Sequence, residues 1–192
     1  MTEYFERNCK LQTNKDTMCW LSNTGHHRYW LSKRLTKKQV KKTTVWLMLN
    51  PSKATAKVTD LTFLKCIGFS KNLGAHELII VNLFAMRSTS PLALWDKGNM
   101  TNIIGYHNDY MINKAITRAN HGLIFAFGQP PNGSWAKAVW STRVVGCWDI
   151  AKSLDKKPMC LGKTKDGWPR HPSRLAYDTD LEKWKLPKEM LL

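Results

Sequence analysis

The sequence has little negative charge. Asp and Glu together number 14 against 30 Lys and Arg, so the 192 residues carry a net charge of +16 with histidine neutral. Between Thr17 and Thr59 there is no acidic residue, although the same stretch contains nine basic ones. An excess of this size attracts a polyanion, and the commonest is nucleic acid, whose phosphates release counterions when Lys and Arg replace them. We therefore expect DNA as the partner.

Long apolar segments and a disulfide framework are also missing. No segment approaches the ~20 apolar residues of a membrane-spanning helix, and residues 1–15 are too polar for a secretory signal. The five cysteines are odd in number and widely spread, which fits a reducing compartment. Nine Trp residues and a hydrophobic content of 43% argue against disorder. We expect a cytoplasmic monomer without a membrane partner, folded as one domain over residues 1–192.

Motifs for nucleotides, redox cofactors and metals are absent. The sequence contains neither Gly-x-x-x-x-Gly-Lys-Ser/Thr nor Gly-x-Gly-x-x-Gly, which argues against nucleotide hydrolysis and dinucleotide redox chemistry. It has no Cys-x-x-Cys pair for structural zinc and no paired-carboxylate cluster for a metal-dependent nuclease. We therefore expect chemistry that needs no metal and no cofactor.

Apolar runs alternate with helical segments along most of the chain. Runs at 44–49, 78–83, 123–127 and 159–161 predict buried strands. Helices are expected over 61–72, 102–119 and 134–154, with a helical turn at 91–95. Residues 1–16 are interpreted as a polar arm, and residues 17–43 as a basic hairpin (19–35) followed by a linker. This alternation predicts an α/β fold, a three-layer α/β/α sandwich with a mostly parallel central sheet.

Four polar or Gly/Pro-rich segments directly follow the predicted strands. They are Asn50-Pro51-Ser52, residues 82–84, Gly128-Gln129 and the loop 162–175. In parallel α/β sheets the ligand binds beyond the carboxyl ends of the strands, so the four segments together predict one site. Taken singly, Asn50-Pro51 also fits an ordinary turn, and His171 also fits a solvent-exposed loop histidine.

Basic residues gather in two segments that are candidates for contact with DNA phosphates. The alternative is a solvated face that keeps the protein in solution. The first segment is the linker and the second is the last loop. Their basic residues are Lys37, Lys38, Lys41 and Lys42, and then Lys163, Lys165, Arg170 and Arg174.

The same motifs resemble two families. The sequences Arg28-Tyr29-Trp30-Leu31, Asn50-Pro51-Ser52, Val81-Asn82-Leu83-Phe84 and Pro169-Arg170-His171-Pro172 are similar to the bacterial and phage family known as domain of unknown function 1643, whose name gives no activity. Their order also resembles the uracil-DNA glycosylase superfamily. That superfamily has an Asn or Asp before Pro, then a base-reading Asn, a strand ending in Gly, and His-Pro-Ser with a Leu four residues after the His. Here Arg174 stands where Pro is common.

The glycosylase resemblance implies a role for each of these residues. Asn50 holds the attacking water, and His171 donates a hydrogen bond to the departing base. Ser173 binds DNA phosphates, and Leu175 fills the gap left by the flipped nucleotide. Asp60 is a rival water activator, although it is more simply a helix N-cap. The residues implied to bind the base are Ser52, Asn82, Phe84, Gly128 and Gln129.

The resemblance implies a DNA glycosylase that leaves an abasic site. Ser52 stands where the uracil-specific branch has a bulky Tyr, so a large C5 substituent is not excluded. We therefore expect release of a bulky 5-substituted pyrimidine, such as glucosylated 5-hydroxymethylcytosine in phage DNA, in antiphage defence. Alternatives are a housekeeping uracil or mismatch glycosylase, a non-catalytic DNA-binding protein on the same fold, and an enzyme acting on modified nucleotides. Residues expected to contact a polar adduct are Lys53, Arg87, Gln129, Asn132 and Lys163.

Overall fold

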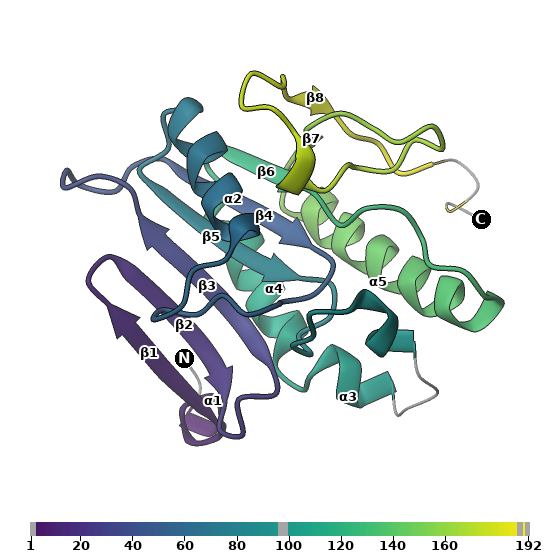
Figure 1. Ribbon diagram of the computed structural model, residues 1–192, viewed down its shortest axis with the longest axis horizontal. Coiled ribbons are helices and arrows are strands. Elements are labelled where there is room, and N and C mark those ends of the chain that lie inside the picture. Colours follow the sequence, from purple (N-terminus) through teal and green to yellow (C-terminus); the bar gives the residue numbers. More distant parts are fainter. Residues whose placement is uncertain (1–2, 96–99, 188–189, 191–192) are drawn as a thin grey trace.

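The chain forms a mixed α/β fold around one eight-stranded sheet (Figure 1). A computed structural model describes residues 3–95, 100–187 and 190. The strand order is β1-β2-β3-β5-β4-β6-β7-β8. The four strands in the middle are parallel, and all four were predicted within one residue at their start. They are β4 (Thr43–Met48), β5 (Glu77–Asn82), β6 (Gly122–Phe125) and β7 (Pro158–Cys160).

The rest of the sheet is antiparallel, so the expected mostly parallel sheet is parallel only at its centre. On one side β1 (Cys9–Asn14), β2 (Thr17–Ser22) and β3 (Arg28–Arg34) pair antiparallel, and β3 pairs antiparallel with β5. On the other side β8 (Glu182–Lys183) pairs with β7. The hairpin expected at 19–35 corresponds to β2 and β3. Short turns can join antiparallel strands, whereas the parallel strands need helical crossovers.

The segment expected to be a polar arm is folded onto the sheet. Residues 1–2 lie outside the described residues, but Glu3–Asn8 form α1 and Cys9–Asn14 form β1. Phe5 is completely buried, and its ring packs against Trp20 at 5.1 Å and His107 at 4.9 Å. The prediction of an arm was wrong because one buried aromatic residue and a fully paired edge strand hold this otherwise polar segment.

Helices cover both faces of the sheet (Figure 1). Helix α2 (Leu61–Asn72) packs Phe63, Cys66 and Phe69 against one face, where they join a buried cluster with Trp46. Helices α4 (Asn108–Arg118) and α5 (Ser134–Ser153) bury their apolar residues with β4, β5 and β6 in a second cluster on the other face. The turn at Pro91–Trp95 is a 3-10 helix.

The helix expected over 102–119 is interrupted. Helix α3 (Met100–Ile104) ends just before Gly105, and α4 begins at Asn108. Gly105 has a φ of +81°, and a Cβ there would lie 3.0 Å from side-chain atoms of His27 and Tyr29. Only glycine fits this left-handed and crowded position without strain, so the chain changes direction there.

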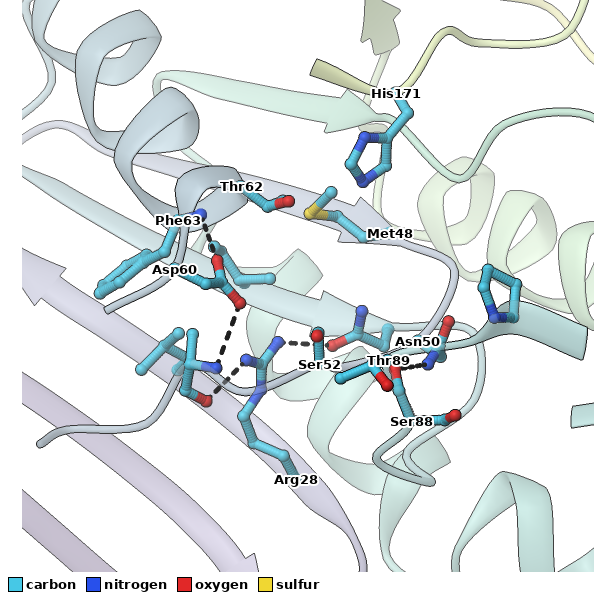
Figure 2. Close-up of a pocket in the computed structure, with 15 residues that line it drawn as sticks. Arg28, Met48, Asn50, Ser52, Asp60, Thr62, Phe63, Ser88, Thr89 and His171 are labelled. Carbon is cyan, nitrogen blue, oxygen red and sulfur yellow. Dashed lines mark hydrogen bonds between the residues drawn. The ribbon is translucent and has the colours of Figure 1, made fainter. Parts of the chain in front are cut away.

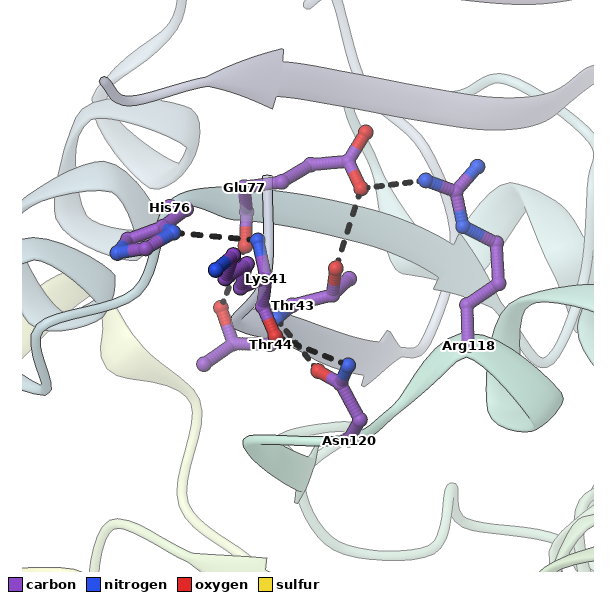
Figure 3. A network of polar contacts seen from close by, with 7 residues as sticks. All are labelled: Lys41, Thr43, Thr44, His76, Glu77, Arg118 and Asn120. Atoms are coloured by element: carbon purple, nitrogen blue, oxygen red, sulfur yellow. Dashed lines mark hydrogen bonds and ion pairs between the residues drawn. The ribbon is translucent and has the colours of Figure 1, made fainter. Parts of the chain in front are cut away.

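A polar network fixes the amino end of β4 (Figure 3). Glu77 Oε2 accepts hydrogen bonds from Thr43 Oγ1 at 3.3 Å and Arg118 Nη2 at 2.6 Å. Asn120 Oδ1 accepts from the Thr43 N–H at 2.8 Å, and its Nδ2 donates to the Lys41 carbonyl at 3.1 Å. These contacts support the register in which Met48 pairs with Asn82. The polar residues that follow β4 and β5 consequently meet at the same edge.

Two further findings concern the cysteines and the apolar character of the helices. All five cysteines are free and buried. Across the described ranges, no helix combines the length and apolar character that a membrane span requires.

Candidate functional site

A pocket of about 230 Å³ lies beyond the carboxyl ends of β4 and β5 (Figure 2). Its lining comes from β3, β4, β5, the loop after β4, the start of α2, the loop after β5 and the segment after β7. His171 and Arg28 lie on opposite sides of it in Figure 2, with Asp60 and Asn50 on the other two sides. Four of the predicted site residues line it, namely Asn50, Ser52, Asn82 and His171.

Asn50 follows β4 in a fixed orientation. Its Nδ2 donates to the Ser88 carbonyl at 3.0 Å and to the Pro51 carbonyl at 3.1 Å. Since both partners are acceptors, the atom facing them is the amide nitrogen, and both of its protons are used. The carbonyl Oδ1 is therefore turned away from Ser88 and Pro51. Asn50 lines the pocket, and its Oδ1 is an acceptor that can hold a water molecule.

Asn82 ends β5 and is held by a buried cation. It is 1% exposed, and its Oδ1 accepts from Arg28 Nη2 at 3.0 Å. Arg28 is 4% exposed, and its Nη1 donates to the Ala54 carbonyl at 3.0 Å. Arginine has only donors, so Asn82 must present its oxygen to Arg28 and direct its amide nitrogen elsewhere. Burial lowers the pKa of the Arg28 guanidinium, which nevertheless stays protonated.

His171 caps the short 3-10 helix Pro172–Arg174 and turns its ring into the pocket (Figure 2). Its Nδ1 accepts from the Ser173 backbone N–H at 3.3 Å and lies 2.9 Å from Ser173 Oγ. A ring nitrogen that accepts carries no proton, so the neutral imidazole carries its proton on Nε2. Desolvation lowers the pKa of His171, and the negative charge of Asp60 opposes this shift. The neutral His171 ring therefore presents an Nε2–H donor.

Asp60 is the N-cap of α2. Its Oδ1 accepts from the Phe63 N–H at 2.8 Å, and its Oδ2 accepts from the Ala54 N–H at 3.1 Å. The interpretation as a helix cap is confirmed. Because Ala54 also binds Arg28, the loop after β4 is tied to β3 and to α2 at one residue.

The pocket therefore combines acceptors and donors whose directions are fixed. Asn50 provides an acceptor, and the His171 imidazole and the Asn82 amide provide donors. The guanidinium of Arg28 adds a buried positive charge to the wall. Such an arrangement can hold a water molecule on one side of a planar polar ligand and stabilise negative charge on the ligand itself.

Three predicted base-binding residues lie elsewhere. Phe84 is completely buried in the core, where its ring packs on Trp95 at 5.3 Å, so its prediction as a base contact was wrong. Phe84 lies beyond the end of β5, and its side chain belongs to the apolar cluster on the face covered by α4 and α5. Gly128 follows β6, and its N–H donates to the Pro169 carbonyl at 3.0 Å. Gln129 lines a different hollow, shared with Asn132 and Asp166.

Leu175 is not free to insert into DNA. It is 4% exposed and belongs to the apolar cluster beneath α2, and the Lys65 ammonium donates to its carbonyl at 2.7 Å. The role expected from the spacing after His171 does not fit this position, because the side chain is already part of the core. Ser173 and Arg174, by contrast, are exposed beside the pocket.

The predicted basic residues divide between the two ends of the sheet. Lys37, Lys38, Lys41 and Lys42 are exposed but precede β4, whereas the pocket follows it. Six strand residues at ~3.3 Å each place this linker roughly 20 Å from the pocket edge. Lys165 and Arg170 are exposed in the loop that leads to His171. Lys163 in the same loop forms an ion pair with Glu182 at 2.8 Å.

The residues expected to contact a polar adduct are mostly engaged or distant. Arg87 donates to the backbone carbonyls of Gly25 at 3.1 Å and Ser52 at 3.4 Å, so it supports the pocket wall. Lys163 is paired with Glu182, and Asn132 lines the hollow that contains Gln129. Ser52 itself faces the pocket with a small side chain.

Sequence reasoning missed Arg28 and the loop after β5. Arg28 was named in the motif Arg28-Tyr29-Trp30-Leu31 and counted among the basic residues, but it was given no role in the site. An arginine that opens an apolar strand is a signal for a buried, hydrogen-bonded cation. Ser88 and Thr89 also line the pocket. Their signal was the polar run Arg87-Ser88-Thr89-Ser90, which follows β5 and the four apolar residues after it.

Comparison with known proteins gives a family without an assigned activity. A family model described as "Protein of unknown function (DUF1643)" matches residues 28–173. The match runs from Arg28 to Ser173, and so contains every residue that lines the pocket. No curated protein and no solved structure matched the chain.

Proposed function

The chain belongs to the DUF1643 family, and we propose that it is a DNA glycosylase, which flips a modified pyrimidine nucleotide out of DNA and hydrolyses its N-glycosidic bond. The observation that carries this proposal is the meeting of Asn50, Asn82 and His171 in one pocket. These three residues lie far apart in the sequence. Their side chains present an acceptor and two donors of the kinds that such hydrolysis needs.

The arrangement of layers supports the proposal. Helix α2 on one face and α4 and α5 on the other are what a three-layer α/β/α sandwich of the uracil-DNA glycosylase type requires. The connection after β4 leads to β5 on one side, while the connection after β6 leads to β7 on the other. Ligands of open α/β sheets bind at such a reversal of strand order, beyond the carboxyl ends of the strands. The pocket lies at this edge.

The charges at the pocket suit the reaction. As the C1′–N bond breaks, electrons move onto the departing base and positive charge develops on the sugar. The Nε2–H of His171 donates to the base, and the buried Arg28 adds positive potential where the base becomes negative. Asn50 Oδ1 accepts from the water whose oxygen forms the new bond to C1′. The water gives its second proton to solvent, and the base anion takes one from solvent.

Asn82 reads the base in this proposal. Its Oδ1 is held by Arg28, so the amide nitrogen is the atom directed to a ligand. An amide donor can bind a carbonyl oxygen or a ring nitrogen of a flipped pyrimidine. Arg28 is then a positioning residue for Asn82, because its hydrogen bond fixes which amide atom meets the base.

The substrate is a pyrimidine with a bulky group at C5, such as glucosylated 5-hydroxymethylcytosine in phage DNA, and the setting is antiphage defence. Ser52 supports this choice because a small hydroxyl side chain lines the pocket where a bulky residue would exclude C5 substituents. Abasic sites made only in modified DNA would spare a host with unmodified bases.

Two substitutions test the mechanism. Asn50→Ala and His171→Ala each lower the rate of base release by on the order of 10²-fold while DNA binding changes little. Asn132→Ala is the matched control, since Asn132 is an exposed amide in another hollow. Release rates of both variants equal to that of the control would refute the roles given to Asn50 and His171.

A further inference from the structure

A second hollow, of about 350 Å³, lies at the amino end of β7 between α5 and β8. Its apolar walls include Trp148 of α5 and Trp184, which follows β8, with ring centroids 5.5 Å apart at 81°. Trp184 is 1% exposed, and its Nε1 donates to the Gly167 carbonyl at 2.9 Å. Trp148 is partly exposed and rests on this fixed ring. The hollow therefore has a rigid aromatic wall with an accessible indole.

Lysines surround this aromatic wall. The hollow is lined by five lysines and by a single acidic residue, Asp155. Lys152 lies in the last turn of α5, where a cation favourably meets the helix dipole. Lys183 and Lys185 come from β8 and the residues after it, so the dipole of α5 does not account for them. The remaining two are Lys156 and Lys157.

We propose that this hollow is a second nucleic-acid site, which binds a single-stranded segment. An exposed base stacks on Trp148, and the flanking phosphates meet the surrounding lysines. Aromatic side chains within a basic groove are the usual means of binding single strands, since every base has a face that can stack. The bases of a duplex are already stacked inside the helix and cannot reach the indole.

The site is separate from the pocket at Asn50 and His171. The second hollow precedes β7, whereas the loop that carries His171 follows β7. Trp148 belongs to the side of the sheet covered by α5, and the pocket lies on the side of α2. A single nucleic-acid strand can therefore occupy the hollow without entering the pocket. The inference goes beyond the proposed function and does not need glycosylase activity.

The test measures binding of labelled, unmodified oligonucleotides to the full chain by fluorescence anisotropy. One variant carries Lys156→Gln, Lys157→Gln and Lys183→Gln. The matched control carries Lys37→Gln, Lys38→Gln and Lys41→Gln, which removes the same charge from the linker, whose lysines do not line the hollow. We expect the variant at Lys156, Lys157 and Lys183 to bind single-stranded DNA about tenfold or more weakly. The slope of log affinity against log salt concentration should become shallower by ~0.7 for each lost phosphate contact. The control should change much less.

Trp148→Phe and Trp148→Ala test the stacking separately from charge. The Ala variant should bind single strands about tenfold more weakly, and the Phe variant should retain most of the affinity. An RNA of the same sequence, run in parallel, identifies which single strand binds more tightly. Equal losses of affinity in the two triple-lysine variants would overturn the proposal. So would tighter binding of duplex than of single strands together with an unchanged affinity in Trp148→Ala. Because unmodified oligonucleotides are used, these results do not depend on whether a base is released.

Discussion

Arg28 joins two parts of the pocket through one buried guanidinium. Its hydrogen bonds reach Asn82 Oδ1 on β5 and the Ala54 carbonyl in the loop after β4, each at 3.0 Å. Arg28→Met would leave both acceptors unpaired in a buried place. We expect this variant to lower the free energy of unfolding by about 1–3 kcal/mol, measured by urea denaturation. Arg28→Lys can satisfy one acceptor and should lose less. Equal free energies of unfolding for wild type and Arg28→Met would contradict the role of Arg28 in joining these two parts of the pocket.

The protonation of His171 can be measured directly. Its pKa is lowered by desolvation, so the folded chain binds fewer protons than the unfolded chain below the usual value of about 6.5. The contribution of neutral His171 to the free energy of unfolding is present above pH ~6.5, and it is lost as the pH falls through the lowered pKa of the folded state. Urea denaturation between pH 5 and 8 should show a smaller loss for His171→Gln than for wild type. NMR of ¹⁵N-histidine should place the proton of the neutral ring on Nε2. A proton on Nδ1 would contradict the geometry at Ser173.

At the scale of elements, the start of α2 shapes the pocket through Asp60. The carboxylate caps the helix at Phe63 and holds the loop after β4 at Ala54. We expect Asp60→Ala to lower the free energy of unfolding by about 1–2 kcal/mol, as measured by thermal denaturation. Asp60→Asn keeps the capping oxygen at Phe63 but places an amide nitrogen opposite the Ala54 N–H, so it should be less stable than wild type and more stable than Asp60→Ala.

The same pair of variants distinguishes a helix cap from a water activator. If Asp60 acts only as a cap, Asp60→Asn retains most of the rate of base release. A rate loss on the order of 10²-fold in Asp60→Asn, measured where the variant is folded, would instead assign the positioning of the water to Asp60.

The parallel centre of the sheet could be predicted from sequence because its strands are continuous apolar runs. Both β4 and β5 are buried along nearly their whole length, and this produces a strong local signal. β1 has no such signal, since only Cys9 of its six residues is buried. The break at Gly105 depends on contacts with His27 and Tyr29, which are distant in sequence.

The candidate site was predictable to the extent that it follows strand ends. Asn50, Ser52 and Asn82 line the pocket because each follows or ends a central strand. Arg28 lies 54 positions from its partner Asn82, so no local pattern could reveal the contact. Leu175 was placed by its spacing from His171, but burial beneath α2 is a property of the folded chain.

At the scale of the whole molecule, the positive charge lies at both ends of the central strands. Lys165, Arg170 and Arg174 are exposed in the segment after β7 that carries His171, whereas the lysines at 37–42 precede β4 at the opposite edge. We expect affinity for a short unmodified duplex to fall linearly with salt on logarithmic axes. Replacing Lys165, Arg170 and Arg174 by Gln should reduce the slope by about 0.9 for each lost phosphate contact.

The control for this charge prediction replaces Lys37, Lys38 and Lys41 by Gln, which changes the net charge equally. It should leave the slope for the short duplex nearly unchanged. A larger change of slope in the linker variant would indicate that the duplex binds at the opposite edge of the sheet, away from the pocket.

The central claim is that the pocket releases a modified base from DNA. The most direct measurement is incubation of the protein with glucosylated 5-hydroxymethylcytosine DNA, uracil DNA and unmodified DNA, followed by mass spectrometry for free bases and cleavage at abasic sites. We predict free glucosylated base and abasic sites from the first DNA, and little release from the other two. Release of uracil alone would replace the defence role with ordinary repair, and the absence of any free base from all three DNAs would contradict the account.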